Sequence, residues 1–280
     1  MTSFATLHAL RAEPAFDTDL LLRGAPCTPH AGVRPGCVTV EIDGVADHLR
    51  FYGRFDRQSA LPPVIFLDGD MIGGERFDAT LRADDTYAQR SPASLQREAE
   101  QYAIATSRLF VHIARPGIFG SSGDHLQRRR PREIALVDAA INQLKLAFSW
   151  DRIDLCGFSG GAHLVAALLA RRTDVRRAVM ASGILAVRRR IDERDGTADV
   201  TGYTDFVDPL DLVAEVAAHA PRSIVILADP DDAAVSAAVQ TAYVDALRSA
   251  GVAVDYRMMS AADPAHHDLR LPAIMCALSA

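Results

Sequence analysis

Hydrophobic and polar residues alternate along the chain with two periods, one typical of strands and one typical of helices. Two segments near the start, 37–43 and 48–55, alternate with period two and are joined by Asp43-Gly44, a pair typical of a tight hairpin turn. Short continuous apolar runs then predict strands that are buried on both faces. These runs lie at 63–67, 109–114, 153–156, 179–182, 223–228 and 254–259.

Apolar residues between these runs recur at helical spacing. In 132–148 they occupy Ile134, Val137, Ile141 and Leu144, which share one helix face. Further helices are expected at 91–107, 237–250 and 268–278, and in the Ala/Leu-rich stretch that ends at Leu169. This alternation predicts an α/β fold, with a mostly parallel twisted sheet, helices on both of its faces and an antiparallel N-terminal hairpin.

The chain divides by composition into an extension, a domain and an insertion within the domain. Residues 1–35 are irregular and proline-rich, which predicts an N-terminal extension, and 36–280 form one α/β domain. The charged segment 186–219 interrupts the rhythm where an insertion would lie over the carboxyl edge of the sheet. It is interpreted either as a short cap that shapes a substrate site or as a surface excursion without a role.

Charge and composition exclude several function classes. The 280 residues carry a net charge of −6, with 49% hydrophobic and 24% charged residues, and show no basic stripe, so neither nucleic acid nor an anionic membrane is an expected partner. Residues 1–22 have no uninterrupted apolar core, so they are expected to be neither a signal peptide nor a membrane span. The four cysteines show no CxxC spacing, which favours reduced thiols in a cytoplasmic protein without a structural zinc site. The run Arg128-Arg129-Arg130 precedes a helix and is interpreted as a solvated face.

The strongest candidate for chemistry is Gly157-Phe158-Ser159-Gly160-Gly161, which lies between an apolar strand and an Ala/Leu-rich helix. A strand, a tight turn and a helix are the context that a G-x-S-x-G nucleophile elbow requires. The turn strains the serine backbone, and a side chain at Gly157 or Gly161 would clash. Ser159 is therefore expected at the helix N-terminus, whose dipole favours a developing oxyanion.

Other suggestive residues favour structural interpretations. His112 lies inside a strand and is expected to be a hydrogen-bonded core histidine, and His163 is expected to be packed or hydrogen-bonded. The glycines and serines of 117–123 suggest a phosphate cradle, but no Lys-Ser/Thr pair follows them, which argues against phosphate binding.

Four landmarks of the sequence resemble the α/β-hydrolase fold, and the resemblance covers about residues 37–280. In chain order they are 66–70, where the family carries a strand and an oxyanion-hole residue, the loop 114–124, the elbow, and the pair of loops 228–236 and 265–269. The order of serine, then aspartate, then histidine is that of the family. Within the fold, the chain looks most similar to dienelactone-hydrolase-like and prolyl-oligopeptidase-like hydrolases.

The resemblance implies a catalytic triad. Ser159 is the expected nucleophile, which needs a neighbouring base to attack an acyl carbon at neutral pH. His267 is chosen as that base because it precedes the closing helix and stands beside Asp268-Leu269, and the adjacent His266 is the alternative.

The resemblance also implies an acid and an oxyanion hole. Asp232 is chosen as the acid because Asp232-Ala233-Ala234-Val235 is similar to the family's Asp-x-x-Val pattern, with Asp229 and Asp231 as competitors. The backbone N–H groups of Asp70 and Gly160 are the expected oxyanion donors. An acidic side chain at position 70 is unfavourable beside an anionic intermediate unless it points away.

Two other function classes compete with the hydrolase. The segment Asp68-Gly69-Asp70 also resembles the Asp-x-Asp loop of haloacid-dehalogenase-like phosphatases, in which Asp68 and Asp70 would act with Mg²⁺ held by Asp229 and Asp232. That loop normally ends in threonine, whereas Met71 follows here. The other class is a non-catalytic hydrolase-fold module that binds a ligand.

We therefore predict a serine hydrolase that cleaves an ester or a small amide through an acyl-enzyme. It is expected to need no cofactor and no metal. Its expected partner is a small-molecule acyl substrate, and the sequence is compatible with a homo-oligomer.

Overall fold

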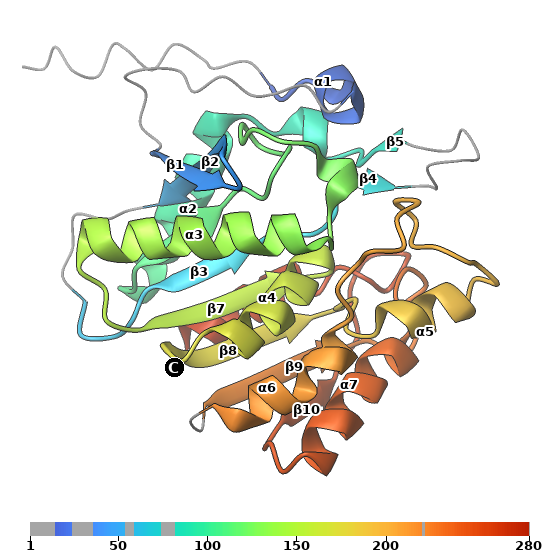
Figure 1. The fold of residues 1–280 in the computed structure, drawn as a ribbon. Coiled ribbons are helices and arrows are strands. Elements are labelled where there is room, and N and C mark those ends of the chain that lie inside the picture. Colours follow the sequence, from blue (N-terminus) through green and yellow to red (C-terminus); the bar gives the residue numbers. More distant parts are fainter. Residues whose placement is uncertain (1–14, 24–35, 54–58, 74–81, 220–221, 280) are drawn as a thin grey trace, which may run out of the picture.

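The computed structural model describes residues 15–23, 36–53, 59–73, 82–219 and 222–279 of the chain. Its centre is an eight-stranded sheet with the order β1-β2-β6-β3-β7-β8-β9-β10, covered by helices on both faces (Figure 1). Strands β6 to β10 and β3 pair in parallel, and β2 joins β6 in the antiparallel sense. The predicted α/β fold class is confirmed.

The hairpin at the start of the domain follows the sequence pattern closely. Strand β1 (Cys37–Ile42) pairs antiparallel with β2 (Val45–Gly53) through the expected turn, where Asp43 and Gly44 have φ angles of 54° and 74°. Positive φ at both positions is what a two-residue hairpin of this twist requires. The last two residues of the predicted second strand, 54–55, lie outside the described residues.

The remaining strands and helices confirm most of the predicted elements within a few residues of their ends. The strands are β3 (Val64–Leu67), β4 (Ile72–Gly73), β5 (Arg82–Ala83), β6 (Phe110–Ile113), β7 (Ile153–Phe158), β8 (Val175–Ala181), β9 (Ser223–Ala228) and β10 (Asp255–Met258). The longer helices are α2 (Pro92–Thr106), α3 (Pro131–Phe148), α4 (Gly160–Arg171), α7 (Ala237–Ser249) and α8 (Arg270–Leu278). The short β4–β5 pair and the 3-10 turns η2 (Tyr87–Gln89) and η3 (His125–Gln127) had no counterpart in the sequence pattern.

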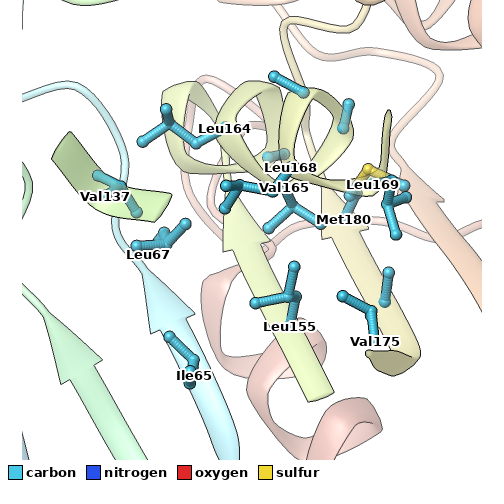
Figure 2. Packing of buried hydrophobic residues seen from close by; sticks show 14 of the residues in the cluster. Ile65, Leu67, Val137, Leu155, Leu164, Val165, Leu168, Leu169, Val175 and Met180 are labelled. Atoms are coloured by element: carbon cyan, nitrogen blue, oxygen red, sulfur yellow. The ribbon is translucent and has the colours of Figure 1, made fainter. Parts of the chain in front are cut away.

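Two hydrophobic layers hold the helices against the sheet. Helices α3, α4 and α7 cover one face, and α2 and α8 cover the other. Figure 2 shows Leu164, Val165 and Leu168 of α4 packed over Leu155 of β7 and Met180 of β8. Because α4 is apolar on nearly every side, it lies in the interior and fixes the residue that precedes it.

The proposed extension and insertion both pack on this core where the structure describes them. In the extension, α1 (Thr18–Arg23) places Leu21 in the core at 2% exposure, and the Phe16 ring lies against Tyr87 and Phe119. The rest of 1–35 lies outside the described residues. The insertion 186–219 contains α5 (Val187–Asp192), the 3-10 turn η4 (Pro209–Leu212) and α6 (Val213–Ala218).

Two further expectations concern membrane-spanning helices and the state of the cysteines. Within the part of the chain that the structure describes, no helix has both the length and the apolar character that crossing a membrane requires. The three described cysteines, Cys37, Cys156 and Cys276, are free thiols, and Cys156 is buried in β7.

Candidate active site

Ser159 occupies a sharp turn between strand β7 and helix α4. Its φ and ψ angles are 51° and −117°, a combination that is strained for a residue with a side chain. The flanking glycines make the turn possible: a Cβ on Gly161 would lie 2.0 Å from the carbonyl oxygen of Leu67, and one on Gly157 would lie 2.5 Å from that of Gly161. The local sequence therefore dictates this geometry, and the rigid α4 maintains it.

Three predicted site residues, far apart in the sequence, form one hydrogen-bonded chain. The His267 Nε2 atom lies 3.0 Å from Ser159 Oγ, and His267 Nδ1 lies 2.8 Å from Asp232 Oδ2. With the proton on Nδ1, the imidazole donates to the carboxylate and Nε2 accepts from the serine hydroxyl. This is the order of contacts that a nucleophile, a base and an orienting acid need.

Loops at the carboxyl edge of the sheet hold both partners of the serine. Asp232 has a fully buried side chain, and its Oδ1 accepts hydrogen bonds from the amides of Ala234 and Val235, each at 2.8 Å. The His267 amide donates to Asp263 Oδ1 at 2.9 Å, and its carbonyl oxygen accepts from Ser182 Oγ at 2.6 Å. The imidazole is therefore fixed from its backbone as well as through its ring.

The alternative candidates His266 and Asp229 form a separate pair beside the hydrogen-bonded series Ser159–His267–Asp232. His266 Nδ1 lies 3.1 Å from Asp229 Oδ2, and the His266 side chain is 43% exposed. Hydrogen bonds from the backbone amides of Asp231 and Ala261 lower the pKa of Asp229. Asp229, Asp231 and His266 lie close enough to share a cation, and each oxygen of Asp229 accepts one backbone hydrogen bond. None of the three contacts Ser159 by a hydrogen bond among the described residues.

The loop after β3 runs close to the serine, and hydrogen bonds hold the amides on both sides of Asp70. A Cβ on Gly69 would lie 3.3 Å from that of Ser159. The Gly69 amide donates to its neighbour Asp68, and the Met71 amide donates to His125 Nε2 at 3.2 Å. Burial and neighbouring arginines hold the pKa of His125 well below its usual range, so its ring is neutral and Nε2 accepts.

The amides of Asp70 and Gly160, the predicted oxyanion donors, have a different environment. No described residue accepts a hydrogen bond from either N–H group. The two residues are adjacent in space, because a Cβ on Gly160 would lie 2.0 Å from Asp70 Oδ1. Two neighbouring amides without an acceptor beside a serine hydroxyl have the composition of an oxyanion hole.

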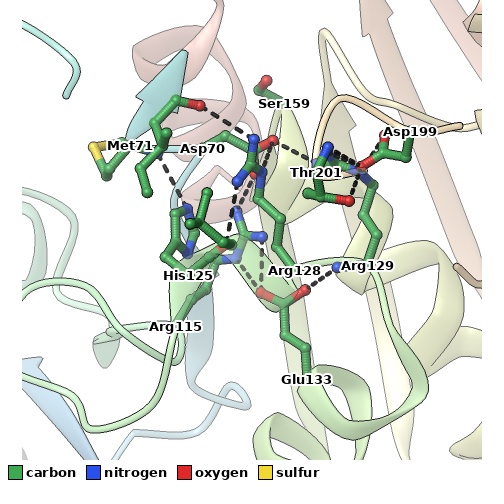
Figure 3. A network of polar contacts seen from close by, with 12 residues as sticks. Asp70, Met71, Arg115, His125, Arg128, Arg129, Glu133, Ser159, Asp199 and Thr201 are labelled. Carbon is green, nitrogen blue, oxygen red and sulfur yellow. Dashed lines mark hydrogen bonds and ion pairs between the residues drawn. The ribbon is translucent and has the colours of Figure 1, made fainter. Parts of the chain in front are cut away.

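The Asp70 carboxylate is enclosed by three arginines (Figure 3). Arg115 Nη1 lies 2.9 Å from Oδ1, Arg128 Nε lies 3.0 Å from Oδ2, and Arg129 also contacts Oδ2. Burial alone would raise the pKa of Asp70, but the guanidinium groups of Arg129, Arg128 and Arg115 outweigh it and hold the pKa well below its usual range. The negative charge at position 70 is thus neutralised within the protein.

The expectation that 128–130 forms a solvated face is wrong for two of its three arginines. Arg128 and Arg129 are 2% and 0% exposed, and only Arg130 reaches the surface. Arg129 also pairs at 2.7 Å with Asp199 of the insertion. This ion pair connects the arginine cluster to the segment 186–219. The charged groups tolerate burial because each meets an opposite charge.

Sequence reasoning missed this arginine cluster, although one signal pointed to it. Asp68-Gly69-Asp70 directly follows a buried strand, and carboxylates at such a position are rarely buried without cationic partners. Which arginines supply the charge depends on the packing of loops that are distant in sequence.

The structure also describes the two histidines and the glycine- and serine-rich loop for which structural roles were expected. His163 is fully buried and its Nε2 donates to the Val207 carbonyl oxygen at 2.7 Å, as expected for a packed histidine. His112 is buried as expected, but its Nε2 has no hydrogen-bond partner among the described residues, and burial lowers its pKa to about 4. The serines of 117–123 bond within the protein, Ser121 Oγ to Ala114 and Ser122 Oγ to Asp47, which argues against a phosphate cradle.

The electrostatics of the acidic loop disfavour the phosphatase alternative. Asp68 Oδ2 lies 3.1 Å from Arg90 Nη1 and 3.6 Å from Arg270 Nη1, and Asp70 is paired as described above. Both carboxylates are therefore already neutralised by guanidinium groups, whose positive charge repels a divalent cation.

Comparison with known proteins gives similarity at the level of the fold. No family model matches the chain. No curated protein matches it either. Solved structures do match: the esterase Pf2001 of Pyrococcus furiosus has a TM-score of 0.56 at 13% identity, over 81% of this chain and 80% of that one.

Two further solved structures extend this similarity. A putative dienelactone hydrolase from Klebsiella pneumoniae has a TM-score of 0.52 at 14% identity, over 87% of this chain and 97% of that one. The acylaminoacyl peptidase of Pyrococcus horikoshii has a TM-score of 0.56 at 12% identity, over 86% of this chain but only 39% of the peptidase. These matches, together with the strand order and the elbow, show that the chain has the α/β-hydrolase fold.

Proposed function

We propose that this chain is a serine hydrolase that cleaves an ester or a small amide through an acyl-enzyme. The single observation that carries the proposal is the chain of hydrogen bonds from Ser159 Oγ through His267 to Asp232, built on a strained turn at the N-terminus of α4. The esterase, peptidase and dienelactone hydrolase named above share the fold, which supports a hydrolytic reaction of this type.

In the proposed mechanism, Ser159 Oγ attacks the acyl carbon while His267 Nε2 takes the hydroxyl proton. The new C–O bond pushes the carbonyl electrons onto oxygen, and the resulting imidazolium is stabilised by Asp232. The tetrahedral intermediate then expels the alcohol or amine, which receives the proton from His267. Water, deprotonated by the same imidazole, attacks the acyl-enzyme, releases the acid and restores Ser159.

The amides of Asp70 and Gly160 are the proposed donors to the oxyanion in both halves of the reaction. A fixed donor of this kind lowers the barrier by about 3–4 kcal/mol. The arginines around Asp70 remove the objection that an acidic side chain stands beside a developing negative charge, because its carboxylate is turned toward them and neutralised.

The proposal is tested with short p-nitrophenyl esters on the wild type and on Ser159→Ala. Removal of a triad nucleophile lowers kcat by about 10⁴-fold or more, so the variant should show only background hydrolysis. A fluorophosphonate probe should label the wild type and not Ser159→Ala. Esterase activity that survives in Ser159→Ala would overturn the assignment.

Two controls separate this proposal from its rivals. Treatment with EDTA should leave a serine hydrolase active, whereas a Mg²⁺-dependent phosphatase would lose its activity. A binding module without catalysis would neither turn over the esters nor react with the probe. A panel of esters, lactones, thioesters and short peptides then ranks the small acyl substrates that we propose as partners.

A further inference from the structure

The ring of Phe158, the residue before the proposed nucleophile, lies between two parts of the candidate site. Its centroid is 5.1 Å from that of the His267 imidazole, and the two ring planes are tilted by 50°. The ring also borders Gly69, because a Cβ on that glycine would lie 3.1 Å from Phe158 Cδ1 and 3.2 Å from Cε1. One side chain therefore packs against both the proposed base and the loop whose Asp70 amide is a proposed oxyanion donor.

Arg270, the first residue of α8, covers the same ring and carries charge to the same two segments. Its guanidinium carbon lies 5.2 Å from the Phe158 centroid, within the range of a cation–π contact. Arg270 Nη1 lies 3.6 Å from Asp68 Oδ2, and Nη2 lies 3.4 Å from Asp268 Oδ2. Asp68 begins the loop that contains Asp70, and Asp268 directly follows the proposed base. The guanidinium thus links by charge the segments that the ring links by packing.

Hydrogen bonds hold each of these two segments, but none joins them directly. The His267 ring bonds to Ser159 and Asp232, and its backbone bonds to Asp263 and Ser182. Among the described residues, no hydrogen bond connects His267 to the loop 68–71. Packing against the Phe158 ring is therefore the direct contact that relates the position of the imidazole to that of the loop.

The burial of this arrangement makes it sensitive to a change in the ring. Phe158 is 5% exposed, and the side chain of Asp68 is 1% exposed. Asp68 is held further by Arg90 at 3.1 Å and by the Gly69 amide at 2.8 Å. Because protein interiors are closely packed, a smaller side chain at position 158 displaces the groups that lie on it.

We propose that Phe158 is a positioning residue: its ring, covered by Arg270, sets the place of the His267 imidazole relative to the Asp70 amide. Both groups act on the same tetrahedral intermediate of the hydrolase proposed above, on which this inference rests. The imidazole transfers the proton, and the amide stabilises the oxyanion. A misplacement of about 1 Å at such a site lowers the rate by about 100-fold.

The first test measures kcat and KM separately for p-nitrophenyl acetate in Phe158→Leu. This substitution keeps an apolar side chain and removes the ring. We expect kcat to fall by about tenfold to 100-fold, because the reacting groups are misplaced, and KM to change by less than about threefold. A loss confined to KM would mean that the ring contributes only to substrate binding, which would overturn the proposal.

Phe110→Leu is the matched control for the loss of a buried ring. Phe110 of β6 is 1% exposed and belongs to the same hydrophobic layer, but its ring contacts are with Phe66 and Tyr102. The control should lower the melting temperature as Phe158→Leu does and leave kcat within about twofold of the wild type. If it lowers kcat as much as Phe158→Leu, the effect is one of general stability and the positioning role is overturned.

Arg270 offers a second variant at a less buried position, with a side chain that is 17% exposed. Arg270→Gln should lower kcat with little change in KM, and Arg270→Lys, which keeps the charge, should recover part of the loss. Circular dichroism and melting temperature show that each variant is folded. Wild-type kcat in Arg270→Gln would overturn the part assigned to the guanidinium.

The failure of this inference is distinguishable from the failure of the hydrolase proposal. If Ser159→Ala retains esterase activity, the hydrolase proposal itself fails. If hydrolysis depends on Ser159 but folded Phe158→Leu has a kcat within about twofold of the wild type, the hydrolase stands and the positioning role of Phe158 is overturned.

Discussion

Replacing Asp70 by asparagine tests the central claim that a neutralised carboxylate organises the loop beside the nucleophile. Asparagine has nearly the same shape, so the substitution removes one negative charge and little volume. In the wild type this charge contacts three guanidinium groups, with distances of 2.9 Å to Arg115 and 3.0 Å to Arg128. The variant leaves Arg115, Arg128 and Arg129 with Glu133 and Asp199 as their remaining partners.

The expected loss of stability follows from the burial of the cluster. The Asp70 side chain is 14% exposed and the arginines are almost completely buried, so solvent compensates little. Breaking a buried ion pair by removing one partner costs about 3–5 kcal/mol. With an unfolding entropy of about 2.1 cal/mol/K per residue, a chain of 280 residues should melt about 5–8 °C lower.

Acid titration provides a second measurement with a definite sign. The arginines hold the folded pKa of Asp70 well below its usual range, and the unfolded value is about 3.9. The stability that this group contributes is therefore fully present above about pH 4 and is lost as the pH falls through the folded pKa. Asp70→Asn should abolish this part of the acid sensitivity.

The assay is thermal and urea unfolding of wild type and Asp70→Asn between pH 3 and 8. Asp205→Asn is the matched control, because Asp205 also receives an arginine, Arg130, but its side chain is 53% exposed. That variant should melt close to the wild type. A melting temperature of Asp70→Asn within about 1 °C of the wild type, or an unchanged acid profile, would refute the reasoning.

Three further substitutions have defined expectations. His267→Gln should lower kcat/KM for p-nitrophenyl esters by about 10³-fold or more, because it removes the proposed base. His266→Gln should change kcat/KM only severalfold. Equal losses in the two variants would contradict the assignment. Gly161→Ala should reduce the yield of folded protein, seen by circular dichroism and gel filtration, because its Cβ would lie 2.0 Å from a strand carbonyl oxygen. Leu168→Ala should lower the free energy of unfolding by about 2–5 kcal/mol, whereas Leu146→Ala, at 78% exposure, should have little effect in the same urea titration.

The sequence by itself determined the elements whose causes are local. The period-two hairpin with Asp43-Gly44, the apolar strands and the amphipathic helices all follow from residue spacing, and the structure has them at the predicted places. The elbow also follows from local sequence, because the glycines at 157 and 161 indicate within five residues that the turn at the serine is tight. Elements that rest on weak local signals, such as α1 and β4–β5, were not predicted.

Other features were decided only by the tertiary structure. The sequence left two histidines and three aspartates as candidates. The structure brings His267 into contact with Ser159, and Asp232 into contact with His267. Adjacent residues such as His266 and His267 have the same chemistry, and only the direction of each side chain from a folded loop separates them.

The burial of the arginines was also decided only by the tertiary structure. Arg128 and Arg129 have a sequence context typical of a solvated surface, yet both are buried because Asp70 and Asp199 reach them from distant segments. Whether a charge is buried depends on its opposite partner, and the distance between the two in space is set by the packing of the whole chain.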